Sequence, residues 1–329
     1  MPPLENFGPY LLLGKLADGG MAHLHHAVHR ERPERVLALK RILPKHAEDP
    51  EFRRFFALER GLSCALSHPN VVQAVDEGTV DGTPYLAMEY IHGRALSRIL
   101  ALARQLNRRL PLPHGVALGV QALEGLDYIH HARTGDGTEL GAVLCDLSPS
   151  NMMVGYDGVL KLIDFGIASS RFKYIEQLGM LRGKKNYLAP EQLRGQPLDL
   201  RADLYAAAVC LVEILTSQPL FQHKSEFEME EALRTGQLPS FTERIPDFPP
   251  ALAEVIARAL SLRPEERYAS AAEFAQALRP FTLTARGGPV GPAQIAQAIQ
   301  PFVSAARRED DAHLARIAQE ARAALDPSG

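Results

Sequence analysis

The chain has 329 residues, of which 46% are hydrophobic and 23% are charged, and its formal net charge is −3. A chain of this length buries about three quarters of its unfolded surface, so it can fold without disulfides or a structural metal. The small net charge gives no electrostatic reason to expect binding to nucleic acid or to an anionic membrane. The chain starts without a basic and apolar leader, and no apolar run approaches roughly 18 residues. We therefore expect a cytoplasmic protein.

Three widely spaced cysteines argue against a disulfide framework or a thiolate zinc site: Cys64, Cys145 and Cys210.

Three strands are predicted near the beginning of the chain. Residues 10–16 and 22–28 flank Asp18-Gly19-Gly20, which is typical of a hairpin turn. In residues 36–42 the strand period of two places Ala38, Lys40 and Ile42 on one face. This lysine therefore shares a face with small and apolar side chains.

A helix is predicted at residues 49–66, because apolar residues recur there at helical spacing. Glu59 falls on the same stripe as the apolar residues Phe52, Phe55, Leu62 and Leu66. A carboxylate in that position is costly without a partner, and Lys40 is an available cation. Two further strands are predicted at residues 71–75 and 85–90.

Helical spacing dominates after Gly93. The exception is an apolar run at residues 158–163, which reads as a strand. A Gly- and Pro-rich linker at residues 286–292 precedes two amphipathic helices, one around Ile295 to Val303 and one around Leu314 to Leu325. The other predicted helices lie at residues 96–104, 114–131, 203–216, 226–234, 251–261 and 271–278.

Acids and an amide recur in the middle of the chain at a spacing typical of phosphoryl-transfer sites. Asn151 follows Asp146 by five residues, and Asp164 ends an apolar run directly before Phe165-Gly166. Carboxylate and amide oxygens are the ligands that magnesium prefers in such sites. With Ala189-Pro190-Glu191 further on, this pattern resembles the protein kinases, in particular the bacterial eukaryotic-like (Hanks-type) serine/threonine protein kinases.

The resemblance implies an α+β, two-lobed protein kinase fold. The small lobe, mostly β with one helix, would span residues 8–91, and the larger, mostly helical lobe would span residues 92–282. A linker at 283–292 and a C-terminal helical extension at 293–329 would follow. ATP and Mg²⁺ would be the cofactors. Asp146 would orient the substrate hydroxyl, while Asn151 and Asp164 would hold the metal.

The nucleotide-binding residues implied by the resemblance lie in the first lobe, except for Met153. Lys40 would meet the α and β phosphates, and Glu59 would fix its position. The glycine-rich loop is altered, because alanines replace its outer glycines at Ala17 and Ala22. Further nucleotide contacts would come from the loop residues Ala17, Gly19 and Gly20, the gatekeeper Met88, the hinge residues Glu89 and Ile91, and the residues enclosing the adenine ring, Leu24, Ala38 and Met153.

Three positions depart from the family pattern His-Arg-Asp-x-Lys-x-x-Asn: Leu144, Cys145 and Ser148. The arginine that Cys145 replaces normally pairs with a phosphate on the activation loop, and between Arg171 and Pro190 there is no Ser or Thr. We expect activity without activation-loop Ser/Thr phosphorylation. Ser148 replaces a lysine beside the catalytic acid. Lys184 stands where a threonine is usual, so we expect the lysine and the hydroxyl to have exchanged sides.

Other polar residues resemble the family's scaffold. Asp203 would brace the backbone of the catalytic loop, and Glu191 would pair with Arg267. Arg104, Arg108 and Arg109 read as a solvated basic face. The four histidines between His23 and His29 do not read as a metal site, because strand alternation separates them.

Protein substrates are implied, with neither nucleic acid nor a membrane as a partner. A protein partner at the C-terminal helices is an open alternative to their packing on the large lobe. The altered loop also leaves open a pseudokinase, a nucleotide-binding or scaffolding module without turnover. A kinase of small molecules is a third alternative, against which Ala189-Pro190-Glu191 argues.

Overall fold

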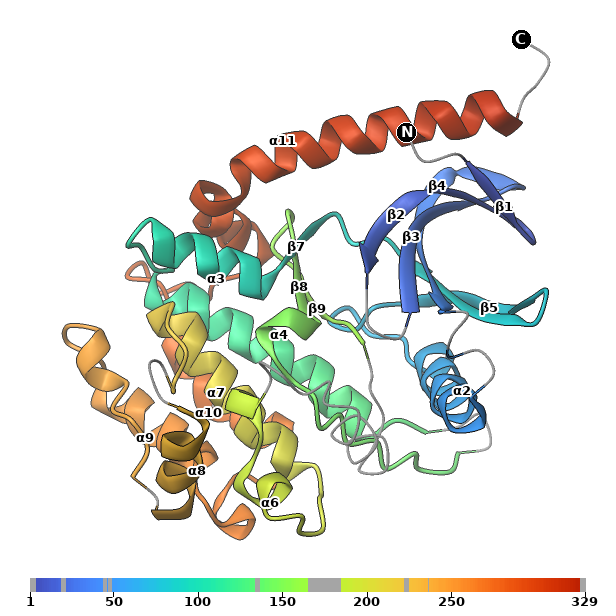
Figure 1. Cartoon of the computed structure of the whole chain (residues 1–329). Coiled ribbons are helices and arrows are strands. Elements are labelled where there is room, and N and C mark those ends of the chain that lie inside the picture. The colour runs from blue at the N-terminus through green and yellow to red at the C-terminus, as the bar shows by residue number, and fades with distance from the viewer. Residues whose placement is uncertain are drawn as a thin grey trace. The chain divides into compact units, whose positions relative to one another are not determined.

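The computed structural model describes residues 4–18, 22–43, 46, 49–133, 137–164, 185–221, 225–235 and 237–325 (Figure 1). The chain forms two compact units. The first contains residues 1–67, 72–92 and 304–329, and the second contains residues 68–71 and 93–303. None of the helices in the described ranges is both long and apolar enough to cross a membrane.

The first unit is built on a six-stranded antiparallel sheet with the strand order β1-β2-β3-β4-β6-β5. The predicted strand at residues 71–75 is displaced, because Val71 makes an isolated bridge to Leu162 and strand β5 begins only at Ala74. Strand β1 was not predicted, and β4 begins four residues before the predicted start, whereas the ends of β2, β3 and β6 lie within two residues of the prediction. The strands are β1 (Glu5–Phe7), β2 (Tyr10–Asp18), β3 (Ala22–His29), β4 (Arg32–Ile42), β5 (Ala74–Val80) and β6 (Thr83–Glu89).

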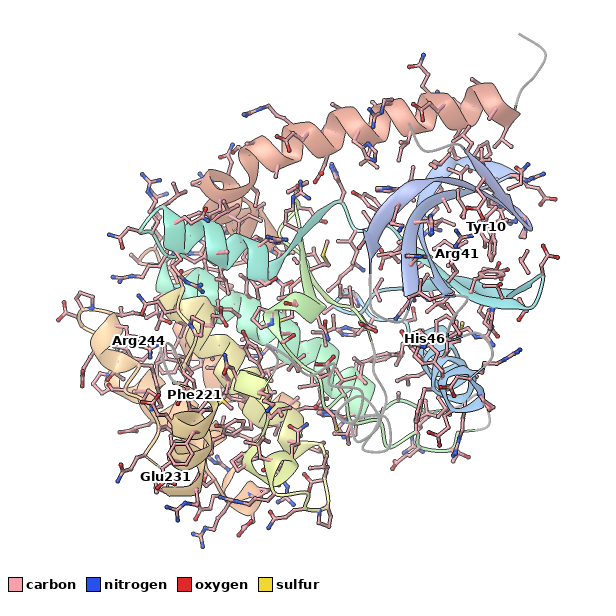
Figure 2. All side chains as sticks on the ribbon, viewed as in Figure 1. Tyr10, Arg41, His46, Phe221, Glu231 and Arg244 are labelled. Atoms are coloured by element: carbon pink, nitrogen blue, oxygen red, sulfur yellow. The ribbon has the colours of Figure 1, made fainter. Side chains whose placement is uncertain are left out.

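Both faces of this sheet are covered by apolar side chains. On one face a cluster includes Tyr10, Leu12, Leu39 and Tyr85, and Tyr10 donates a hydrogen bond to Asp76 Oδ2 at 2.6 Å (Figure 2). The strand period sends Leu11, Leu13 and Val28 to the other face, where they pack against Ile317 and Ala321 near the end of the chain.

Helix α2 (Pro50–Ala65) lies in the first unit and begins at Asp49, whose side chain accepts hydrogen bonds from the amides of Glu51 and Phe52. Glu59 is buried on this helix, as the periodicity predicts. Phe56 rather than Phe55 is the buried aromatic residue, because Phe56 stands four residues after the buried Phe52 and three before Glu59.

The second unit is mostly helical, as predicted. Its centre is helix α7 (Arg201–Thr216), which is buried along almost its whole length. A three-stranded sheet accompanies the helices, and the sequence predicted only one of its strands: β7 (Gly93–Ala95), β8 (Met152–Gly155) and β9 (Leu160–Leu162). The other helices are α3 (Leu96–Gln105), α4 (Leu112–His130), α6 (Pro190–Leu193), α8 (Glu226–Thr235), α9 (Pro250–Ala259) and α10 (Ala271–Leu278).

The C-terminal extension forms one helix, α11 (Pro292–Leu325), of 34 residues. The prediction of two separate helices was wrong, because residues 304–313, although polar, are mostly strong helix formers such as Ala, Arg and Glu. Pro301 lies inside this helix. The helix starts against Gly158, which has a φ of 85° and no room for a β-carbon beside the Pro292 backbone.

Candidate active site

An ion pair links the sheet and the helix of the first unit. Nζ of Lys40 on β4 lies 2.5 Å from Oε1 of Glu59 on α2, and the glutamate side chain is only 3% exposed. The pairing predicted from two independent periodicities is therefore present. A buried carboxylate needs such a partner, and in return it holds the lysine ammonium in a fixed place.

The predicted hinge follows strand β6. The Glu89 amide donates to the Gln73 carbonyl at 2.9 Å, and Glu89 Oε1 accepts from the Gln73 amide at 2.8 Å. This residue thereby fixes the end of β6, after which the backbone at Ile91 leaves the sheet. Met88 is half-buried and pairs in register with Ala38 on β4.

The remaining predicted nucleotide contacts of the first unit lie on β2 and β3. Leu24 pairs in register with both Lys40 and Ala17. Gly19 and Gly20 lie outside the described residues, and their role stays a prediction.

In the second unit, the predicted catalytic acid and metal ligand meet directly. Asn151 ends a single 3-10 turn that starts at Pro149, and its side chain is buried. Its Nδ2 donates to Asp146 O at 2.9 Å and to Asp146 Oδ2 at 3.1 Å. Because the amide nitrogen faces Asp146, Oδ1 is directed away from it.

Asp164 is brought to the same place by the hairpin of β8 and β9. The Ile163 amide donates to the Asn151 carbonyl at 2.9 Å, so the residue before Asp164 is tied to the predicted metal ligand. Asp164 is exposed and has a left-handed φ of 64°. Such a backbone costs about 1 to 3 kcal/mol and is typically found at functional sites. Met153 lies on β8, opposite Lys161.

The oxygen groups present here fit magnesium. Magnesium keeps several waters and takes only one or two protein carboxylates or similar groups beside the substrate phosphates. Asp164 and the Asn151 Oδ1 supply such a pair.

Asp203 at the start of α7 holds the backbone of the acid loop. Its Oδ2 accepts from the Leu144 amide and its Oδ1 from the Cys145 amide, both at 2.8 Å. Asp203 is completely buried, so two amide donors stabilise its charge. The predicted brace is therefore present.

His130 at the end of α4 completes this arrangement and was not identified from the sequence. Its Nε2 lies 2.9 Å from Asp203 Oδ2, and its side chain is 1% exposed. The signal that could have found it is the one that found Glu59, a polar residue on the buried side of a helix.

Cys145 has a left-handed backbone, with a φ of 59°, and a buried side chain. Burial, and then the charge of Asp203, raise the pKa of its thiol well above the usual range. The thiol therefore stays protonated and does not act as a nucleophile. Its backbone contributes to the loop instead, because its carbonyl accepts from Gln192 Nε2 at 3.0 Å.

Helix α6 connects this loop to a buried ion pair. Arg267 donates to both carboxylate oxygens of Glu191, at 2.6 and 2.8 Å, and its side chain is fully buried. The predicted pair is present. Gln192, the next residue, accepts from the Ala189 amide at 2.8 Å while it donates to the acid loop. No sequence motif indicates this role of Gln192.

Arg104 is exposed, as predicted for a solvated face, but it also binds partners that the sequence did not indicate. Its Nε donates to the Ser217 carbonyl at 2.9 Å, and its Nη2 lies 3.3 Å from Glu213 Oε1. Tyr187, close before the Ala-Pro-Glu motif, donates to Glu213 Oε2 at 2.6 Å. A buried glutamate on α7 attracts the arginine, which a pattern of surface charges could not reveal.

The predicted exchange of a lysine and a hydroxyl involves Ser148 and Lys184, of which the structure describes only Ser148. Ser148 is buried, and its hydroxyl oxygen has no hydrogen-bond partner within the described part of the chain. Lys184 falls in residues 165–184, outside the described residues, so its role stays a prediction.

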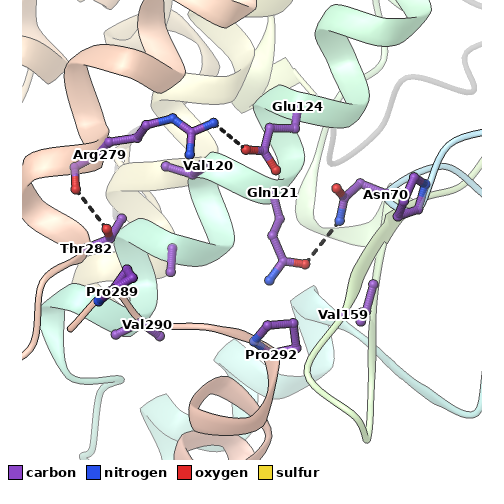
Figure 3. Close-up of a pocket in the computed structure, with 12 residues that line it drawn as sticks. Asn70, Val120, Gln121, Glu124, Val159, Arg279, Thr282, Pro289, Val290 and Pro292 are labelled. Atoms are coloured by element: carbon purple, nitrogen blue, oxygen red, sulfur yellow. Dashed lines mark hydrogen bonds and ion pairs between the residues drawn. The ribbon is translucent and has the colours of Figure 1, made fainter.

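A cavity of about 310 Å³ in the second unit is separate from these groups (Figure 3). Its polar side chains bind one another: Asn70 donates to Gln121 Oε1 at 3.1 Å, and Arg279 to Glu124 Oε1 at 2.7 Å. The predicted acids and amide of the described chain do not line it.

Comparison with known proteins agrees with this geometry. Residues 10–279 match the family model described as protein kinase domain. The chain is 37% identical over 284 residues to "Tyrosine-protein kinase MasK" of Myxococcus xanthus, covering 85% of this chain and 44% of that protein. It is 34% identical over 274 residues to "Serine/threonine-protein kinase PknH" of Mycobacterium bovis, covering 82% and 44%. The chain thus spans less than half of the length of these curated relatives.

A solved structure is also similar. The kinase domain of Mycobacterium tuberculosis PknI superposes with a TM-score of 0.64 at 28% sequence identity, covering 85% of this chain and 99% of that one. The residues that match the family model, 10–279, include Lys40, Glu59, Asp146, Asn151 and Asp164.

Proposed function

This chain belongs to the protein kinase family, and we propose that it transfers the γ-phosphoryl group of ATP to serine or threonine hydroxyls of protein substrates. The observation that carries this proposal is the hydrogen-bonded set Asp146, Asn151 and Ile163, which joins the acid, the amide and the strand before Asp164. Such a set positions a hydroxyl and a metal-bound phosphate for transfer.

Each residue has a task that follows from its surroundings. Glu59 holds the Lys40 ammonium, which donates to the α and β phosphates of ATP. Asp146 accepts a hydrogen bond from the substrate hydroxyl and orients its oxygen for attack on the γ-phosphorus. Asn151 and Asp164 hold magnesium, which when bound neutralises the phosphate charge. Leu24, Ala38 and Met153 contact the adenine ring, and the backbone from Glu89 to Ile91 pairs with its edge.

Lys184 supplies, in this proposal, the cation that the loop lacks at Ser148. Phosphoryl transfer concentrates charge on the γ-phosphate, and a preorganised cation stabilises the transition state. Ser148 is buried with a hydroxyl that lacks a partner in the described ranges, so it has a donor to offer but no charge. In most of the family a lysine of the acid loop and a threonine before the Ala-Pro-Glu motif lie beside the catalytic acid. Here Ser148 would supply the hydroxyl and Lys184 the cation, so the two groups would have exchanged positions.

The kind of hydroxyl acted on has two candidates. The names of PknH and of PknE, which is 34% identical over 282 residues, support Ser/Thr. The name of MasK, a relative of higher identity, supports tyrosine as the second candidate. We favour Ser/Thr, and we place the reaction in the cytoplasm, where ATP is made available to such enzymes.

A pseudokinase is not favoured. A module without turnover has no need to retain a buried Lys40–Glu59 pair together with Asp146, Asn151 and Asp164. The substitutions at Leu144 and Cys145 leave the loop intact, because both amides still bind Asp203.

The test is transfer of labelled phosphate from ATP with Mg²⁺ to a generic protein, followed by identification of the phosphorylated amino acid. We expect phosphoserine or phosphothreonine with the wild type and none with Asp164→Asn. Phosphotyrosine alone would select the second candidate. ATP binding without transfer would favour the pseudokinase.

A further inference from the structure

The end of the chain covers the face of the first-unit sheet that carries Leu11, Leu13 and Val28. The match to the kinase family model ends at residue 279, whereas α11 begins at Pro292, so this helix lies outside the shared domain. Its apolar stripe is what holds it there. The contacts on α11 are Leu314, Ile317, Ala321 and Leu325, which pack with Leu11, Leu13, Val28 and Val36 of the strands.

The same part of α11 reaches the predicted hinge through two polar residues. The ring of His313 lies 5.0 Å from the ring of His26 on β3, which in turn lies 5.1 Å from the ring of Tyr90. Asp311 Oδ1 lies 3.0 Å from Nε2 of His92. All these residues belong to the first unit.

Helix α11 contacts His92 directly and Tyr90 through the ring of His26, and these two hinge residues stand on either side of Ile91. Tyr90 and His92 follow the end of β6, where sheet hydrogen bonds no longer hold the backbone. A backbone segment that binds a ligand through its own amide and carbonyl loses conformational entropy on binding. Contacts that already restrict the segment in the free protein reduce this entropic cost. His26 is 4% exposed, so the surrounding side chains restrict its ring, which lies between those of Tyr90 and His313.

We propose that residues 304–325 of α11 clamp the hinge, with Asp311 and His313 as positioning residues for the nucleotide-binding backbone at 90–92. This proposal rests on the proposed function, since it assigns ATP to the hinge. It makes nucleotide affinity depend on a helix that the kinase domain itself does not include. The chemistry at Asp146 and Asp164 does not depend on it.

The test compares two variants of the 329-residue chain. Asp311→Ala/His313→Ala removes the contact with His92 and the ring that supports His26 beneath Tyr90. Arg308→Ala/Glu309→Ala removes a basic and an acidic residue at exposed positions of the same helix. The dissociation constant of a non-hydrolysable ATP analogue, KM for ATP and kcat are measured, together with hydrogen exchange of the amides of residues 89–93 without nucleotide.

We expect the first variant to bind the analogue about three- to tenfold more weakly, with KM raised in proportion and kcat within about twofold of the wild type. Its hinge amides exchange faster. The control variant matches the wild type in every measurement. In a His92→Ala background, Asp311→Ala adds no further loss, because its partner is already gone.

Unchanged hinge exchange and unchanged affinity in the first variant would overturn the clamp, as would a fall in kcat with no change in KM. Failure of the proposed function looks different. If the wild type bound no ATP but the variant still showed faster hinge exchange than the control, the clamp would stand and the assignment of ATP would fall.

Discussion

The ammonium of Lys40 and the carboxylate of Glu59 lie 2.5 Å apart, joining strand β4 to helix α2 at a place where the glutamate has almost no access to water. The lysine has one defined position because the glutamate cannot be left unpaired. The phosphate contact that we propose for Lys40 therefore depends on Glu59 as well.

Replacing Glu59 tests this dependence. We expect Glu59→Gln to lower kcat/KM for ATP about 100-fold, the loss typical when one preorganised donor is displaced. Glu51→Gln, on the exposed first turn of the same helix, serves as the control and should retain the wild-type value. Steady-state kinetics with ATP as the varied substrate measures both, and equal values for the two variants would refute the role of Glu59.

Two neighbouring lysines allow a test of the cation that is missing at Ser148: Lys184 is the proposed substitute, and Lys185 serves as the control. If Lys184 stabilises the transferring phosphoryl group, Lys184→Ala should lower kcat at saturating ATP by about 100-fold. Lys185→Ala should lower it by less than about threefold. Introducing lysine through Ser148→Lys should restore part of the activity of Lys184→Ala. Full activity in Lys184→Ala would show that the charge comes from elsewhere.

Phosphorylation of the activation loop should be unnecessary. Cys145 replaces the arginine that would bind such a phosphate, and no Ser or Thr lies between Arg171 and Pro190. Protein treated with a Ser/Thr phosphatase, and then freed of it, should keep its initial rate of transfer. Mass spectrometry of the loop before and after treatment provides the control. Loss of activity together with loss of a loop phosphate would contradict the account.

Two buried histidines should make the fold sensitive to acid. Burial lowers the pKa of the His25 imidazole from 6.5 to about 4, and the nearby charge of Arg41 adds to this effect. Burial likewise lowers the pKa of His26 from 6.5 to about 4, with a further contribution from the charge of His313. The folded state thus binds fewer protons than the unfolded chain below pH 6.5. The contribution of each neutral histidine to the free energy of unfolding is fully present above pH 6.5. It is lost as the pH falls toward 4, and the loss is at most about 3 kcal/mol for each histidine.

The variant His26→Phe should remove part of this slope. Urea unfolding at pH 7, 6 and 5 gives the free energy of unfolding, and the variant should lose less stability than the wild type between pH 7 and 5. His131→Phe alters a histidine whose side chain is 62% exposed, and it should keep the wild-type slope. The same slope in all three proteins would rule out His26 as a source of the pH dependence.

The sequence could predict what depends on local spacing. Periodicity alone placed Glu59 inward, opposite Lys40, and the motif spacing identified Asp146, Asn151 and Asp164. The Asp203 brace followed from the family resemblance. Glu59, Asp146, Asn151 and Asp164 each belong to a recognisable pattern within one segment, whereas the Asp203 brace joins two distant segments and needed the family pattern.

Contacts between distant segments were not predictable in the same way. His130 and Gln192 bind the acid loop from helices α4 and α6, and Arg104 finds a buried partner on α7. The sequence also left the C-terminal helices to the large lobe or to another protein, whereas Ile317 packs on the sheet of the first unit. An apolar stripe shows that a helix face is buried but does not identify its partner. A protein partner at this helix stays a prediction.

The most direct measurement is the initial rate of γ-phosphoryl transfer by the wild type and by Asp164→Asn, with binding of an ATP analogue measured on the same samples. We predict magnesium-dependent transfer by the wild type and a rate at least about 100-fold lower for the variant. A wild type that binds the analogue but transfers no faster than Asp164→Asn would contradict it.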